Sequence, residues 1–154
     1  LHICDPAGEE LPAGEDGLIY FENQIMPSYH NDPEKTAEAT HAAGWMTLGD
    51  IGHADAEGYL YLTDRKSHMI ISGGVNIYPQ EIENLLVSHP KVMDAAVIGA
   101  PDPDLGEQVV AVVQPLDMAS AGDMLEQELR DFLAPQLSRV KMPRSFEFRA
   151  ELPR

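Results

Sequence analysis

The residues best suited to bind a ligand lie around two adjacent glycines, Gly73 and Gly74. A glycine pair lets the backbone approach a ligand closely, because neither residue carries a Cβ. We expect the pair to lie between a short strand and a helix that begins at Pro79, whose first N–H groups carry a partial positive charge. The same pair also serves as a plain turn, so the glycines alone leave both interpretations open.

Two charged residues upstream could bind the hydroxyl groups of a sugar. Asp50 follows a predicted strand and could accept paired hydrogen bonds from a diol such as ribose. Arg65 could bind the same diol or a phosphate. Taken separately, Asp50 also fits a turn and Arg65 an ordinary surface position.

Hydrolytic and metal chemistry find little support in the sequence. Ser72 is followed by two glycines and does not match the G-x-S-x-G elbow, and Cys4 has no base predicted beside it. The six histidines never fall at the i, i+4 spacing of a helical zinc pair. The pattern Asp102-x-Asp104-x-x-Glu107 resembles a calcium loop, but its flanking prolines favour a turn. The sequence therefore predicts no metal site.

The chain is strongly acidic, with a formal net charge of −16 at pH 7. A surface of this kind repels nucleic acid and anionic lipid, so neither is an expected partner. Two segments escape the acidity: residues 65–91 carry three bases and two acids, and residues 139–154 carry five bases and two acids. If the protein binds an anion, these segments permit it, with chance composition as the alternative.

The composition of the 154 residues is that of a globular protein, with 44% hydrophobic residues. The longest uninterrupted aliphatic run, residues 109–113, is far too short for a transmembrane segment. The chain begins with Leu1 and shows no targeting signal, so we expect a piece of a longer polypeptide. Its single cysteine fits a reducing compartment, and we expect a cytoplasmic protein.

The hydrophobic patterns predict an α+β fold. The first part is β-rich, with strands at 17–21, 45–48 and 59–63 and one helix from Asp32 or Asn31 to about His41. From residue 69 onward we predict strands at 69–72, 92–98, 108–114 and 145–148, with the two middle strands well buried. Helices are predicted at 79–88 and from the Ser120-x-x-Asp123 pattern to Pro135. The resulting order, βαββαβ, indicates two helices on a small sheet.

Three segments resemble, in order and spacing, the signatures of the adenylate-forming acyl-CoA synthetase superfamily. They are Gly44-Trp-Met-Thr-Leu-Gly-Asp50, Asp64-Arg-Lys-Ser-His-Met-Ile-Ile-Ser-Gly-Gly-Val-Asn-Ile-Tyr-Pro-Gln-Glu-Ile-Glu83 and Pro101-Asp-Pro-Asp-Leu-Gly-Glu107. Residues 8–17 and 29–36 are similar to the stretch that precedes the first signature in that family. The resemblance covers nearly the whole chain and is specific for the superfamily, but much less so for the substrate.

The resemblance implies an enzyme in two parts that alternates between domain orientations. Residues 1–64 would be the last β-rich subdomain of the large AMP-binding domain, and residues 65–154 would be most of the small mobile C-terminal domain. Such an enzyme uses ATP and Mg²⁺ to convert a carboxylic acid, here expected to be a fatty acid, to acyl-AMP and pyrophosphate. It then transfers the acyl group to the thiol of CoA. The expected partners are these small molecules and the N-terminal domain of the same chain.

The resemblance also assigns roles to five residues. Asp50 matches the aspartate that binds the ribose hydroxyls, and Arg65 matches the arginine that joins it. Ser67 matches the hinge position, where the family more often has Asp or Lys. Gly73 and Gly74 match the loop that lines the pantetheine tunnel of CoA.

Three further residues could contact phosphates. Asn76 falls where some members place a residue near the nucleotide phosphates. Lys141 and Arg144 could meet the phosphates of CoA, although a solvated basic face is the alternative. The family's catalytic lysine follows a segment like residues 151–154, so we expect it beyond Arg154. No catalytic residue is then expected within the chain, which should not catalyse adenylation alone.

Two other functions remain open at this point. An adenylation domain that loads a carrier-protein thiol would share the same signatures. A non-catalytic binding module could have kept the small domain alone, although the presence of Asp50 and Arg65 argues against it, because such a module needs no ribose ligand.

Overall fold

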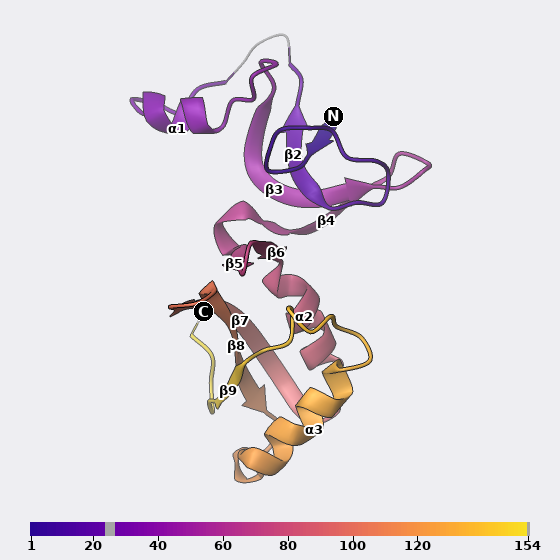
Figure 1. Cartoon of the computed structure of the whole chain (residues 1–154), viewed down its shortest axis with the longest axis vertical. Coiled ribbons are helices and arrows are strands. Elements are labelled where there is room, and N and C mark those ends of the chain that lie inside the picture. Colours follow the sequence, from indigo (N-terminus) through magenta and orange to yellow (C-terminus); the bar gives the residue numbers. More distant parts are fainter. Residues whose placement is uncertain (24–26, 154) are drawn as a thin grey trace. The chain divides into compact units, whose positions relative to one another are not determined.

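Two compact units make up the chain, Leu1–Ser67 and His68–Arg154 (Figure 1). The computed structural model describes residues 1–23 and 27–153. Each unit has its own β-sheet, of four strands in the first and five in the second, with helices beside them. The α+β class predicted from the sequence is confirmed.

The first unit is an antiparallel sheet in which the strands pair in chain order. Its strands are β1 (His2–Cys4), β2 (Gly17–Phe21), β3 (Met46–Ala54) and β4 (Leu60–Arg65). The bounds of β2 are as predicted, whereas β1 was not predicted and β3 runs beyond residue 48. The strand β3 continues because Gly52 lets it approach β4 closely: a Cβ there would lie 2.1 Å from the carbonyl oxygen of Tyr61.

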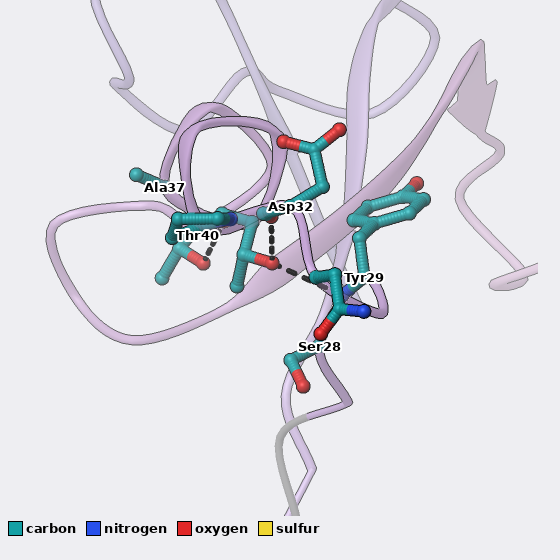
Figure 2. Close-up of a pocket in the computed structure, with 8 residues that line it drawn as sticks. Ser28, Tyr29, Asp32, Ala37 and Thr40 are labelled. Carbon is teal, nitrogen blue, oxygen red and sulfur yellow. Dashed lines mark hydrogen bonds between the residues drawn. The ribbon is translucent and has the colours of Figure 1, made fainter.

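The short helix α1 (Pro33–Glu38) begins where the sequence predicts it. The carboxylate of Asp32 accepts a hydrogen bond from the Lys35 N–H at 2.9 Å, and Pro33 occupies the first helical position. The Thr40 hydroxyl donates to the Thr36 carbonyl oxygen at 2.7 Å (Figure 2). The predicted end near residue 41 is too late, because Thr40 already forms a β-bridge with Met46.

The second unit is a five-stranded sheet with two helices. Its elements are β5 (Ile70–Ser72), β6 (Val75–Ile77), α2 (Pro79–Val87), β7 (Val92–Asp102), β8 (Gly106–Pro115), α3 (Asp123–Leu133) and β9 (Ser145–Phe148), with short 3₁₀ turns at Lys66–His68 and Met118–Ser120. The strand order is β6-β5-β8-β7, and β9 pairs with β8 in parallel. The predicted order missed β6, so the correct order is ββαββαβ.

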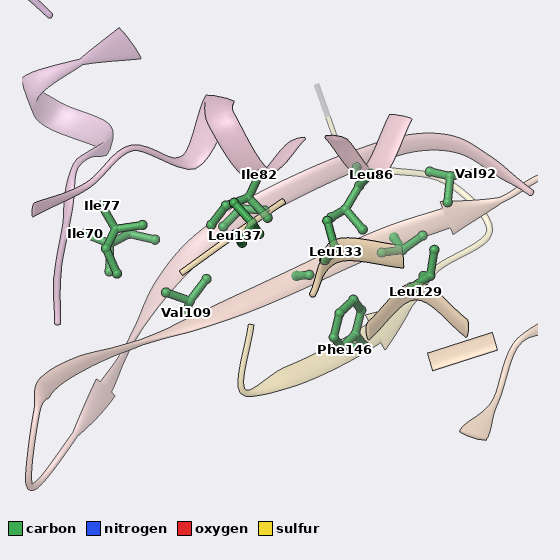
Figure 3. Packing of buried hydrophobic residues seen from close by; sticks show 14 of the residues in the cluster. Ile70, Ile77, Ile82, Leu86, Val92, Val109, Leu129, Leu133, Leu137 and Phe146 are labelled. Atoms are coloured by element: carbon green, nitrogen blue, oxygen red, sulfur yellow. The ribbon is translucent and has the colours of Figure 1, made fainter. Parts of the chain in front are cut away.

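One face of this sheet packs against both helices. Figure 3 shows the side chains from α2, α3 and the strands in a single cluster. The helical spacing i, i+4 puts Ile82 and Leu86 on one face of α2, and Leu129 and Leu133 on one face of α3. Because side chains alternate along β8, Val109 and its alternate neighbours meet the helices.

Two predictions for this unit are wrong. The strand β7 is not well buried throughout, because alternate residues point away from the helices and leave Met93 56% and Ile98 51% exposed. The helix α3 begins at Asp123 after Gly122, not at Ser120. The Ser120 hydroxyl donates to the Asp117 carbonyl oxygen at 2.6 Å in a 3₁₀ turn and therefore does not cap the helix.

The core of the second unit predicts a contrast between two positions of α3. Leu129 is 0% exposed and Met124 is 88% exposed. We expect Leu129→Ala to lower the free energy of unfolding by about 2–5 kcal/mol, because it leaves a cavity among the helices and the sheet. Met124→Ala is the matched control and should change it by less than about 0.5 kcal/mol. Denaturant unfolding followed by circular dichroism measures both, and equal effects would contradict this account of the core.

Candidate functional site

Asp50 and Arg65 face each other across two adjacent strands of the first unit. They are paired residues in the β3–β4 register, and the Arg65 Nε lies 3.3 Å from the Asp50 Oδ1. The Asp50 side chain is 24% exposed and the Arg65 side chain 66% exposed, so both remain accessible from solvent. The structure therefore brings together a hydrogen-bond acceptor and a cationic donor, a combination that suits a diol.

The glycine pair closes a hairpin in the second unit. Gly73 and Gly74 have φ angles of +57° and +79°, in the left-handed region that favours glycine. Two such residues in succession form the two-residue turn whose twist matches that of the flanking strands. The expectation that the pair separates a strand from a helix is wrong, since β6 lies between the turn and α2.

The glycine turn also touches the connection between β7 and β8. The Gly73 N–H donates to the Leu105 carbonyl oxygen at 2.9 Å, and Ser72 pairs with Gly106. Asn76 lies on β6, where it pairs with Ile71 of β5. The turn is thus attached to the β7–β8 hairpin by its backbone, and both glycines remain exposed.

The two candidate phosphate-binding cations each have a carboxylate partner in the second unit. The Lys141 Nζ lies 2.6 Å from the Glu81 Oε2, and the Arg144 Nη1 lies 3.5 Å from the Asp102 Oδ2. The Arg144 side chain is 56% exposed. Lys141 and Glu81 are partly exposed, and so is Arg144, so a phosphate could reach and compete for either cation.

Asp102 shapes the connection that meets the glycine turn. Its Oδ1 accepts hydrogen bonds from the N–H groups of Leu105, at 2.9 Å, and Asp104, at 3.0 Å. These bonds, with a smaller contribution from Arg144, hold the pKa of Asp102 below its ordinary value of 3.8. The carboxylate therefore stays charged at neutral pH and fixes the turn.

A cavity of about 620 Å³ in the second unit brings several of these parts together. Its lining residues come from β5, the β7–β8 connection, β8, α3 and the segment before β9: Ser72, Leu105, Val109, Arg130, Arg139, Val140, Met142, Pro143 and Arg144. Arg144 and the residue beside the glycine pair thus share one cavity, whereas Lys141 and Asn76 are not in its lining.

Sequence reasoning missed two arginines of this cavity. Arg139 could have been found, because it begins the basic segment 139–154. Arg130 lies in an acidic stretch and gave no such signal. Its guanidinium donates to Glu126 and to the carbonyl oxygens of Pro143 and Arg144, so it holds the segment before β9 in place.

A second hollow, of about 670 Å³, lies beside α1 in the first unit (Figure 2). Its polar groups bind one another: the Tyr29 N–H donates to the Thr36 hydroxyl, which donates to the Asp32 carbonyl oxygen. None of the residues that the sequence singles out for ligand binding lines it.

Residues 1–23 and 27–153 contain neither a metal-binding cluster nor a membrane-spanning helix. Within these ranges no group of three His, Cys, Asp or Glu side chains is arranged to hold a metal ion. Cys4 is buried, and burial followed by nearby carboxylates raises the pKa of its thiol. No helix in the same ranges is long and apolar enough to cross a membrane.

Comparison with known proteins identifies the class. Residues 81–154 match the family described as the AMP-binding enzyme C-terminal domain. Over 155 residues the chain is 43% identical to a feruloyl-CoA synthase from Amycolatopsis sp, and over 154 residues it is 41% identical to the fatty acid–[acyl-carrier-protein] ligase ScoC from Streptomyces coeruleorubidus. Each alignment covers 99% of this chain but only 30% and 29% of the respective relative.

A solved structure supports the same assignment. ATP-bound MatB from Rhodopseudomonas palustris superposes with a TM-score of 0.84 at 36% identity, over 99% of this chain and 30% of that protein. The resemblance predicted from the signatures is confirmed: residues 81–154 match the C-terminal domain of AMP-binding enzymes, and the whole chain is similar to part of the adenylate-forming enzymes named above. The chain spans about a third or less of the length of these relatives.

The lowered pKa of Asp102 predicts a pH-dependent effect of Asp102→Asn. A carboxylate with a lowered pKa stabilises the folded state above its ordinary value of 3.8, and this contribution is lost as pH falls through the lower, folded-state pKa. The variant should therefore be less stable than the wild type at pH 7, and the difference should shrink below about pH 4. Urea unfolding between pH 3 and pH 7 measures this.

The control is Asp131→Asn, which removes one exposed carboxylate of α3 and the same formal charge. A difference between wild type and Asp102→Asn that stays constant over the whole pH range would show that the Asp102 charge contributes nothing to folding.

Proposed function

We propose that the chain is the C-terminal part of an ATP-dependent acid–thiol ligase. The enzyme activates a carboxylic acid as acyl-AMP, with release of pyrophosphate, and transfers the acyl group to the thiol of CoA. The observation that carries the proposal is the Asp50–Arg65 pair on adjacent strands, in a chain similar throughout to adenylate-forming enzymes. In such an enzyme this segment must supply the side chains that bind the ribose of ATP.

Asp50 and Arg65 of the first unit then act in the adenylation step. Asp50 accepts hydrogen bonds from the two ribose hydroxyls of ATP, and Arg65 donates to the same sugar. Residues 1–64 belong to the large domain in this proposal, and Ser67 is the hinge to the small domain of residues 65–154. The division of the structure into compact units at Ser67 and His68 supports a hinge there.

The second unit serves the transfer step. Gly73 and Gly74 line the path of the pantetheine arm, since their outer surface carries no side chain. Lys141 and Arg144 bind the phosphates of CoA by exchanging their carboxylate partners for phosphate oxygens, and Asn76 lies near the nucleotide phosphates. Mg²⁺ accompanies ATP, whose phosphates are bound mainly by the N-terminal part of the enzyme. We place the reaction in the cytoplasm.

The substrate class is a further part of the proposal. We take the acid to be a fatty acid, as the name of the relative ScoC states for that protein, although the relative from Amycolatopsis is named for an aromatic acid. ScoC also supports a second candidate function, in which the acceptor is the thiol of an acyl carrier protein. In either case the first step is the same.

Pyrophosphate release by the complete enzyme tests the proposal. We expect release that depends on the added acid, strongest with fatty acids among a panel that includes aromatic and short dicarboxylic acids. With CoA present, acyl-CoA should accumulate. Release of pyrophosphate without formation of acyl-CoA would indicate that the acceptor is a carrier-protein thiol. The absence of any acid-dependent pyrophosphate release would contradict the ligase proposal.

Asp50→Ala tests the ribose site in the same enzyme. Because the variant loses hydrogen bonds to a buried diol, we expect kcat/KM for ATP to fall by a factor that corresponds to about 1–3 kcal/mol. Glu57→Ala, which removes an exposed carboxylate from the turn between β3 and β4, is the matched control. An unchanged dependence on ATP in Asp50→Ala would remove this residue from the site.

A further inference from the structure

The strand β5 pairs with β6 along its whole length but is joined to β8 by few backbone bonds. In the described part of the chain, β5 and β8 share one register pair, Ser72 with Gly106. The next N–H along β5, that of Ile71, donates instead to the side chain of Glu107, at 2.7 Å from its Oε2. The Glu107 carboxylate thus acts as the acceptor that a second backbone pair would otherwise supply.

The sheet leaves a space for this carboxylate. Glu107 pairs with Pro101 of β7, and its side chain lies over Gly99, two residues earlier on the same strand. A Cβ on Gly99 would lie 2.8 Å from the Glu107 Oε1 and 3.0 Å from its Cδ. Gly99 is not in the left-handed region, so the space above it, and not its backbone conformation, is what requires glycine.

We propose that Glu107 is a positioning residue, whose carboxylate fixes β5 and thereby the Gly73–Gly74 turn on the β7–β8 hairpin. The Glu107 carboxylate holds Ile71 in β5, while the hydrogen bond from Gly73 to Leu105 holds the first residue of the turn. Gly99 supports Glu107 by leaving room for it. Glu107 need not touch a substrate for this role.

The consequence for the reaction rests on the proposed function of the glycine turn. If the turn lines the path of the thiol-bearing arm, a shift of about 1 Å there misplaces the thiol and slows transfer strongly. Formation of the acyl-adenylate does not use the turn. Loss of Glu107 should therefore slow the second half-reaction and spare the first.

Amide hydrogen exchange of the 154-residue chain, resolved by residue with NMR, tests the positioning role without any assay of activity. In Glu107→Ala we expect the amides of Ile71 and Gly73 to exchange about tenfold faster, while those of β7 and β8 keep their rates. Glu107→Gln retains an acceptor oxygen and should stay close to the wild type. Gly99→Ala should behave like Glu107→Ala, because its methyl group displaces the carboxylate.

The control is Glu147→Ala, which removes a carboxylate of β9 whose partner is Arg149. Unchanged exchange at Ile71 in both Glu107→Ala and Gly99→Ala would overturn the proposal. If Glu107→Ala loosens the whole sheet, the comparison of Glu107→Gln with Gly99→Ala decides, since only the second should speed exchange at Ile71.

The complete enzyme provides the functional test. We expect Glu107→Ala to raise the KM for CoA or slow acyl transfer about tenfold, with adenylate formation within about twofold of the wild type and recovery in Glu107→Gln. Equal slowing of both half-reactions would overturn the specific role in transfer. A wild-type enzyme that forms no acyl thioester would instead overturn the proposed function, and the exchange result would then still decide whether Glu107 positions the turn.

Discussion

The antiparallel pairing of β7 with β8 is the interaction on which the second unit depends. Ten residue pairs link the two strands, from Val92–Pro115 to Asp102–Gly106. The strands β5 and β9 pair with the other edge of β8, β6 pairs with β5, and both helices pack on one face of the β7–β8 pair. The carboxylate of Glu83 on α2 accepts a hydrogen bond from the Val97 N–H at 2.8 Å, which joins this helix to the edge of β7. Burial of one face of the β7–β8 pair thus determines where the helices and the other strands of the second unit lie.

In the second unit, the glycine turn and Arg144 both lie near one end of this hairpin. Its connection, shaped by Asp102, contacts the glycine turn through Leu105 and contacts the basic segment through Arg144. A carboxylate of the core hairpin therefore stands between a cation suited to phosphate and a backbone turn suited to a narrow ligand. The strands β7 and β8 hold the glycine turn and Arg144 in position, so no long network of side chains is needed.

Because the chain is rich in carboxylates, many of its lysine and arginine side chains form ion pairs within their own unit. Lys141 meets Glu81, Arg130 meets Glu126, and Lys91 meets Glu128. Such pairs near the surface contribute little stability. In the first unit, Asp50 and Arg65 form a similar pair across two strands. In the proposed function, a ligand with phosphate or hydroxyl groups takes the place of one partner in such a pair.

The sequence by itself determined the helices and strands that have a clear hydrophobic period or a clear start or stop residue. Pro33 and Pro79 mark helix starts, Leu129 and Leu133 mark a buried helix face, and β2 and β9 have the predicted bounds. Local signals sufficed there because each depends on backbone geometry or on burial of one face. The signatures from Gly44 to Glu107 likewise indicated the superfamily.

Only the tertiary structure decided which residues meet across the chain. The hairpin closed by Gly73 and Gly74 was not predicted, because β6 is three residues long and has no period of its own. The bond from Ile71 to Glu107 joins residues 36 positions apart, and the room that Gly99 leaves for it arises from strand register. Contacts of this kind follow from how strands pair, which local sequence does not specify.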